Sequence, residues 1–221
     1  MGTGGPWVIP MTDTVDLLRL QQWLSPAFPI GGFAYSHGLE AAISSGDVTD
    51  PESTQAWVRA IIGQGAGFAD AVLLIAARRG QSISELTDIA AALAASKERW
   101  DETRELGAAF VRVARETGAA AERAPLPIAV GQAARALDLS DDTVAASYLQ
   151  SMAATLIGAA VRFVPLGQAE GQRLQAEMAP LCVATAERAA TATLDDIYGF
   201  VPAADLAAMA HETQEVRIFK T

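Results

Sequence analysis

The sequence predicts an all-α protein, and three observations support that fold class. Hydrophobic residues make up 51% of the 221 residues, and much of that share is alanine, the residue with the highest helix propensity. Apolar residues recur three or four positions apart along much of the chain, as on one face of a helix. Stretches that alternate between apolar and polar residues, which would indicate half-buried strands, are sparse.

The first helix is expected over residues 13–24, where leucines recur at helical spacing. Pro26 and Pro29 then prevent its continuation, because proline lacks a backbone N–H. A second helix is expected from Phe33 or Ala34 to Ser44. The remaining helical patterns cover residues 51–79 with an interruption at three glycines, 84–95, 97–117, a segment from APLP to about 137, 140–163, 166–190 and 203–212.

We find no repeat, linker or low-complexity tract that would divide the chain. The predicted organisation is therefore one helical domain over residues 13–210, preceded by a flexible leader over residues 1–12 and followed by a C-terminal tail over residues 211–221. The leader lacks the basic segment and long apolar core of a signal peptide.

Composition argues against several functional classes. The net charge of −10 and the pI near 4.6 disfavour binding to nucleic acid or to anionic membranes, and suit basic protein partners. The apolar runs are shorter than the roughly 20 residues of a membrane span. Cys182 is the only cysteine, so no internal disulfide can form, which agrees with a cytoplasmic protein.

Motifs for catalysis, nucleotide binding or metal binding are weak. GQGAG at residues 63–67 follows a helical pattern rather than a strand, so we interpret its small residues as sites of close helix packing. His37, His211 and Cys182 are too far apart in sequence to indicate a metal site, and we expect His211 to lie in a solvated tail. Cys182 falls among apolar residues, which favours a buried structural thiol. We therefore predict no catalytic residue, no tightly bound cofactor and no metal ligand in this chain.

The stretch PIGGFAYSHGLE forms an unusual turn, which we call the elbow. Its candidate residues are Gly31, Gly32, Tyr35, Ser36, His37 and Glu40. Ser36 and Glu40 would share a helical face, whereas the neighbours Ser36 and His37 would diverge and could not act as a nucleophile and its base. The elbow is either a structural device or a surface for a partner.

Five segments together resemble the UreF family of urease accessory proteins. LLRLQQWLSPAFPIGGFAYSHGLEAAI is similar to its N-terminal signature, and SKERWDETRELGAAF to its middle motif. VGQAARALDL, YLQSMAATLIGAAVRFVPLGQAEGQRL and HETQEVRIFKT follow in the family's order. One departure is Leu126-Pro127, where the family often has His-Pro, so no role of that histidine transfers to this chain.

The resemblance implies an all-α, single-domain bundle of about ten helices that tends to dimerise and has no catalytic activity of its own. It implies that the chain binds UreD (also called UreH), that this complex recruits the GTPase UreG, and that the assembly delivers nickel to apo-urease in the cytoplasm. Nickel would be handled by the complex rather than held tightly by this chain.

The resemblance also suggests a channel for nickel within the complex. Polar residues in the second half are candidates for its lining: Gln168, Gln172 and Arg173. Hydrogen bonding between helices, or a polar dimer interface, explains these residues as well.

The tail mixes charged and apolar residues and follows a short helix. We expect it to be mobile in the isolated chain, with Phe219 able to enter a partner pocket and Arg217 to pair with a carboxylate. The resemblance implies that the tail folds on binding UreD, and the alternative is that it packs on its own domain. The predicted partner-binding residues are Glu212, Gln214, Glu215, Arg217, Ile218, Phe219 and Lys220.

Three functional hypotheses remain at this point. The first is a scaffold for nickel insertion, and the second is a regulator of GTP hydrolysis by UreG. The third is a stand-alone helical enzyme that uses Tyr35, His37 and Glu40, which the lack of a cofactor motif disfavours.

Overall fold

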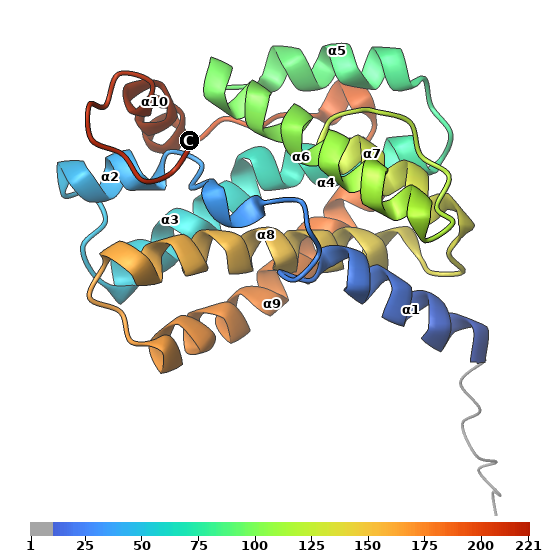
Figure 1. The fold of residues 1–221 in the computed structure, drawn as a ribbon, viewed down its shortest axis with the longest axis horizontal. Helices are drawn as coiled ribbons and strands as arrows, with labels where there is room; N and C mark the ends of the chain where they lie inside the picture. Colours follow the sequence, from blue (N-terminus) through green and yellow to red (C-terminus); the bar gives the residue numbers. More distant parts are fainter. Residues whose placement is uncertain (1–10) are drawn as a thin grey trace, which may run out of the picture.

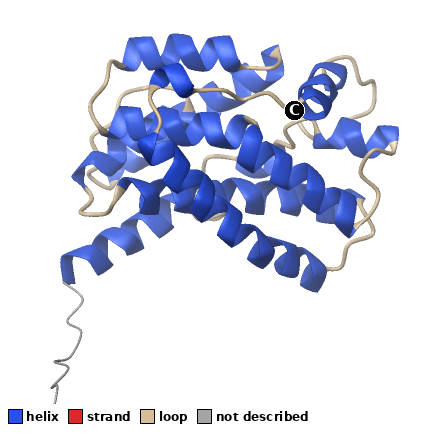
Figure 2. Cartoon of the chain, turned by 180° about the vertical axis from the view of Figure 1, so that it is seen from behind, coloured by secondary structure: helices blue, strands red, loops and turns tan. Residues whose placement is uncertain are grey.

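The computed structural model describes residues 11–221, so residues 1–10 of the expected leader lie outside the described part of the chain. Within residues 11–221 there are helices and loops and no strand (Figures 1 and 2), which confirms the predicted all-α fold class. The α-helices are α1 (Met11–Leu24), α2 (Leu39–Ser45), α3 (Pro51–Gln64), α4 (Ala66–Arg78), α5 (Ile83–Leu93), α6 (Lys97–Glu116), α7 (Leu126–Ala133), α8 (Asp141–Phe163), α9 (Gln168–Thr191) and α10 (Pro202–His211). Three 3₁₀ turns are η1 (Gly32–Ala34), η2 (Ala134–Ala136) and η3 (Leu194–Asp196).

Several helices begin where local chemistry favours a start. Asp50 caps α3 by accepting a hydrogen bond from the Ser53 N–H, and Pro51 occupies the first helical turn, where its missing N–H costs nothing. Ser96 and Ser140 cap α6 and α8 in the same way. These are the starts that the sequence predicts, because a cap is a local feature.

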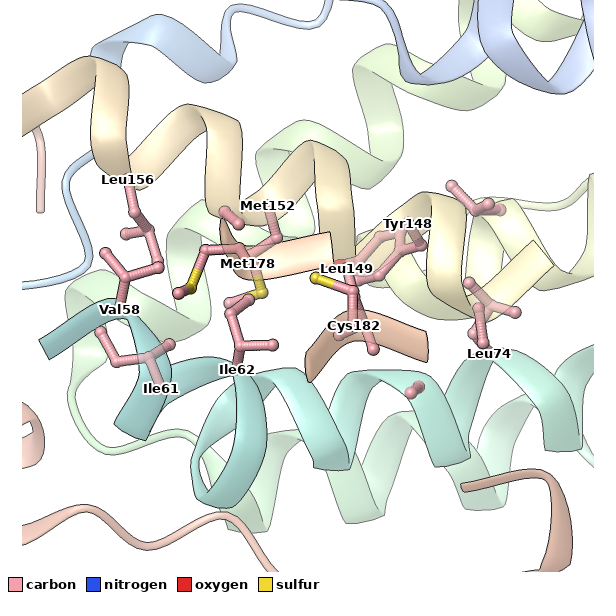
Figure 3. Close-up of a cluster of buried hydrophobic side chains, with 14 of the residues drawn as sticks. Val58, Ile61, Ile62, Leu74, Tyr148, Leu149, Met152, Leu156, Met178 and Cys182 are labelled. Atoms are coloured by element: carbon pink, nitrogen blue, oxygen red, sulfur yellow. The ribbon is translucent and has the colours of Figure 1, made fainter. Parts of the chain in front are cut away.

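The core lies between α3, α4, α8 and α9. Figure 3 shows side chains from these helices meeting: Val58, Ile61 and Ile62 from α3, Leu74 from α4, Tyr148, Leu149, Met152 and Leu156 from α8, and Met178 and Cys182 from α9. Helices α8 and α9 pack along each other, and α7 packs against both α4 and α6. Cys182 is 1% exposed, which confirms the prediction of a buried thiol.

The glycine-rich stretch at residues 63–67 joins α3 to α4 and follows a helix, unlike a dinucleotide-binding loop. A Cβ atom at Gly67 would lie 2.7 Å from the Ile62 Cα. Only glycine fits where α4 approaches α3 this closely, which confirms that Gly67 serves close helix packing.

Two helical stretches, Pro51–Arg78 and Asp141–Phe163, are apolar and long enough to span a membrane by composition. Their most apolar windows are 78% and 56% buried inside the domain. Burial of this kind is what the core helices of a globular protein show, so these helices are weak evidence for a membrane protein.

The prediction of a second helix from Phe33 or Ala34 to Ser44 is wrong over the first half of that range. Instead of one helix from Phe33 or Ala34, the chain forms the short turn η1, and α2 begins only at Leu39. The reason lies in the backbone: His37 and Gly38 have positive φ angles of 56° and 77°, which interrupt a right-handed helix.

Candidate partner-binding site

The elbow brings the start of α2 against α10. Gly31 has a φ of 79°, which glycine adopts without strain, whereas Gly32 lies in the 3₁₀ turn with no positive φ. Gly38 caps α2, and a Cβ atom there would lie 2.6 Å from the backbone nitrogen of Ala208. Glycine at this position therefore permits the close approach of two helices far apart in sequence.

The C-terminal tail lies in the space that the elbow creates. The Lys220 N–H donates to the Ala34 carbonyl at 2.8 Å, and the Ser36 N–H donates to the Thr221 carbonyl at 3.0 Å. Figure 1 shows the C-terminal end of the chain beside α2 and α10. The elbow and the tail are thus one structural unit, although about 180 residues separate them.

Glu40 is the main acceptor for the tail. It is 4% exposed, and its two carboxylate oxygens accept hydrogen bonds from the backbone N–H groups of Ile218 and Phe219, at 2.8 and 2.9 Å. A carboxylate that accepts two backbone N–H groups forms charge-assisted bonds, which are stronger than neutral ones. This geometry assigns Glu40 a structural role that its position in the sequence alone did not reveal.

In this structure the tail packs on its own domain, which is the alternative to Phe219 lying in a partner pocket. Phe219 is 4% exposed, and its ring packs 5.4 Å from the Phe163 ring and under the guanidinium of Arg162. Phe219 therefore fills a pocket of its own domain rather than one of a partner. Arg217 likewise pairs with Glu98 of the same chain, at 2.5 Å.

Three carboxylates spaced along α6 receive the tail's side chains. Besides Glu98, Glu102 accepts from the Thr221 hydroxyl at 2.7 Å, and Glu105 pairs with Lys220 at 3.0 Å. Their spacing of three or four residues places them on one face of the helix. Sequence reasoning missed this acidic row, although the spacing itself was visible.

His211 is fully buried at the end of α10, so the expectation of a solvated histidine is wrong. Its Nδ1 lies 2.7 Å from a Glu98 oxygen, and its Nε2 lies 3.3 Å from a Glu40 oxygen. The histidine thereby connects α10 to both α6 and α2. Of the predicted tail residues, Glu212 and Glu215 are exposed and Gln214 is half-buried, and Glu212 accepts from the Glu98 N–H at 3.1 Å.

The second histidine has a different environment. His37 contacts Glu102 through Nε2 at 2.8 Å, and Arg99 pairs with the same carboxylate. Burial, followed by the charge of Arg99, lowers the pKa of His37. Burial opposes the charge on Glu102, but Arg99 and His37 outweigh it and lower the pKa of that carboxyl to about 2.

The three residues of the enzyme hypothesis face separate partners. The Tyr35 hydroxyl donates to Glu105 at 2.6 Å, while His37 contacts Glu102 and Glu40 binds the tail. Burial, together with that bond to Glu105, raises the pKa of the Tyr35 hydroxyl well above its usual range. Ser36 donates to the Thr221 carbonyl and is not paired with His37. The side chains do not converge on one reacting atom, and this geometry disfavours the hypothesis of a stand-alone enzyme.

Next to the elbow is a cavity of about 370 Å³ between α1, α6 and α8. Its lining includes Trp23, Asp70, Arg99 and Tyr148. Burial raises the pKa of Asp70 to about 6, even though the Tyr148 hydroxyl donates to it at 2.7 Å. Within residues 11–221, no group of three or more His, Cys, Asp or Glu side chains is arranged to hold a metal ion.

The three candidate channel residues do not form one group. All three are exposed on α9, and Gln172 borders the cavity of about 370 Å³. Arg173 instead forms surface ion pairs with Glu170 and Glu177, both at 2.5 Å. A role for Gln168, Gln172 and Arg173 in a channel or a dimer interface stays a prediction.

Exposed apolar side chains also occur on the last two segments of the chain. On the tail, Val216 and Ile218 are 83% and 72% exposed, and on α10, Leu206 and Met209 are 65% and 49% exposed. We call these four residues the apolar tail surface. Large exposed apolar side chains that form a contiguous patch are typical of protein interaction sites.

The fold and the site define an all-α domain whose C-terminal tail, elbow and acidic α6 row form one composite surface. The family model of UreF matches residues 48–179. A urease accessory protein UreF of Jannaschia sp. (strain CCS1) is 50% identical over 211 residues, which cover 94% of this chain and 96% of the relative. A protein of the same name from Cereibacter sphaeroides (strain KD131 / KCTC 12085) is 54% identical over 206 residues, covering 93% and 98%. The chain therefore belongs to the UreF family, which confirms the resemblance seen in the sequence.

Proposed function

We propose that this protein is a urease maturation scaffold that binds UreD (UreH) and recruits the GTPase UreG for nickel insertion into urease in the cytoplasm. Membership of a family whose members are named urease accessory proteins supports the general role. The apolar tail surface is the observation that carries the binding role. Nickel is the cargo of this process rather than a resident cofactor of the chain.

The composite surface suits protein binding better than catalysis. Its charged side chains are paired with one another, as Arg217 with Glu98 and Lys220 with Glu105, and are not directed at a common point. Its apolar side chains face outward from a backbone whose N–H groups at Ile218 and Phe219 are hydrogen-bonded to Glu40, and an ordered backbone loses less entropy on binding. We expect the chain to act as a homodimer within the assembly.

The test replaces exposed side chains, because the tail also contributes to the core. Deleting residues from Gln214 onward would remove Phe219 and would disturb the domain itself. Val216→Asp with Ile218→Asp adds charge where the side chains are exposed and leaves Phe219 in place. The matched control is Val15→Asp on α1, which is 54% exposed and far from the tail in sequence.

We expect the double variant to keep its helix content and melting temperature, to lose UreD binding in a pull-down, and to fail in reconstituted activation of apo-urease. The control should bind and activate as the unmodified protein does. Normal UreD binding and activation by a folded double variant would refute the proposed binding surface.

A further inference from the structure

The position of His211 connects three helices through one imidazole ring. The ring belongs to the last residue of α10, and its two nitrogens contact Glu98 of α6 at 2.7 Å and Glu40 of α2 at 3.3 Å. The exposed fraction of the His211 side chain is 0%, and that of Glu40 is 5%. Water therefore has little access to replace either contact.

The number of protons decides whether both contacts are hydrogen bonds. A neutral imidazole carries one N–H, whereas the protonated form carries two. Ionised carboxylates only accept hydrogen bonds, so a neutral His211 would direct one nitrogen lone pair at a carboxylate oxygen. Only the protonated ring donates to Glu40 and Glu98 together.

The same two carboxylates hold the tail. Glu40 accepts the N–H groups of Ile218 and Phe219, and Glu98 pairs with Arg217 at 2.5 Å. The charged groups that face His211 are Glu40 from α2, Glu98 from α6 and Arg217 from the tail itself. Without its second proton, His211 no longer brings a positive charge into contact with both Glu40 and Glu98, and the ion pair of Arg217 reaches Glu98 but not Glu40.

The other histidine shows why this arrangement is specific. His37 contacts one carboxylate, Glu102, and needs only one N–H for that bond. Arg99 supplies the positive charge beside Glu102. His37 can therefore lose its second proton without losing a hydrogen bond.

We propose that His211 acts as a proton-sensitive clasp, in which loss of its second proton weakens the hold of Glu40 and Glu98 on residues 217–219 and releases the tail. The clasp regulates the surface assigned above, and in this respect it rests on the proposed function. Raising the pH favours loss of a proton, so the release is expected on raising the pH and not on lowering it.

The experiment measures amide hydrogen exchange at Ile218 and Phe219 in the full chain between pH 5 and pH 8, relative to the intrinsic exchange rate at each pH. We expect protection to fall by about tenfold or more across this range, the loss of one charge-assisted hydrogen bond. In His211→Gln, the amides of Ile218 and Phe219 should be weakly protected at every pH, and their protection should not fall as the pH rises.

Two carboxylate variants separate the clasp from a general effect of charge. In Glu98→Gln the new side chain can donate to a neutral imidazole, so protection of both amides should persist at pH 8. Glu105→Gln is the matched control, because Glu105 binds Lys220 and Tyr35 but not His211. Glu105→Gln should show the same fall in amide protection with rising pH as the unmodified protein.

Flat protection of the unmodified chain from pH 5 to pH 8 would overturn the proposal, and so would an unchanged fall in protection in His211→Gln. If His211→Gln does not fold, the difference between Glu98→Gln and Glu105→Gln decides the matter. The exchange measurement requires no partner, so its failure leaves the proposed binding of UreD untouched. A failure of UreD binding would likewise leave the measured clasp intact.

Discussion

Replacing Gly38 by alanine tests how the elbow is built. Two costs combine at this position. An L-residue at a φ of 77° costs about 1–2 kcal/mol, and the new Cβ atom would lie 2.6 Å from the Ala208 nitrogen and 2.8 Å from its Cα. Both of these atoms are backbone, so α10 must move, and such overpacking typically costs a further 1–3 kcal/mol, about the range for cores.

We expect Gly38→Ala to lower the free energy of unfolding by about 2–5 kcal/mol, and the melting temperature by roughly 4–20 °C for a chain of this size. Urea denaturation monitored by circular dichroism measures the free energy of unfolding, and a thermal scan measures the melting temperature. The change should also loosen the contact between α2 and α10, because the added atom is located at that contact.

Two neighbouring glycines provide matched controls. Gly31 has a positive φ, but a Cβ atom added there would have no neighbour within 4 Å, so Gly31→Ala should cost only the backbone strain, about 1–2 kcal/mol. Gly32 has neither a positive φ nor a close neighbour, so Gly32→Ala should be near neutral. Equal effects at all three positions would refute this account of the elbow, and so would a neutral Gly38→Ala.

Two further predictions concern buried titratable groups. Burial raises the pKa of Asp70 to about 6, so the stability that this residue contributes at low pH is lost as the pH rises through about 4 to 6. The Asp70→Asn variant should lack that loss of stability. At pH 7–8 it should therefore unfold at a higher urea concentration than the unmodified protein. An Asp70→Asn variant that is less stable at pH 8 than the unmodified protein would contradict this reasoning. Burial likewise raises the pKa of the Cys182 thiol to about 11, so a thiol reagent should react slowly with the folded chain and rapidly with the urea-unfolded chain. Rapid reaction of the folded chain would contradict this prediction.

The composite surface also explains why truncation and surface substitution should differ. Phe219 faces the core while Ile218, the residue before it, is 72% exposed. Adjacent residues of an extended segment point to opposite sides, so one side of the tail stabilises the domain and the other is available for binding. A deletion removes both sides of the tail at once, whereas a substitution at Ile218 changes only the exposed side.

The sequence by itself determined the fold class, most helix limits and the absence of a recognisable nucleotide motif. The starts of α3, α6 and α8 depend on Asp50, Ser96 and Ser140, whose side chains cap residues three positions away. The amphipathic pattern of α6 is equally local. Short-range chemistry of this kind can be read directly from adjacent residues.

Only the tertiary structure decided the role of the elbow and the tail. Glu40 meets Phe219 across 179 positions in sequence, and His211 meets Glu98 across 113. Nothing in the local pattern of either segment indicates its distant partner, and an isolated tail with few apolar residues resembles a mobile terminus. The tail packs on the domain because α2, α6 and α8 together present four carboxylates and an aromatic contact that no single stretch of sequence contains.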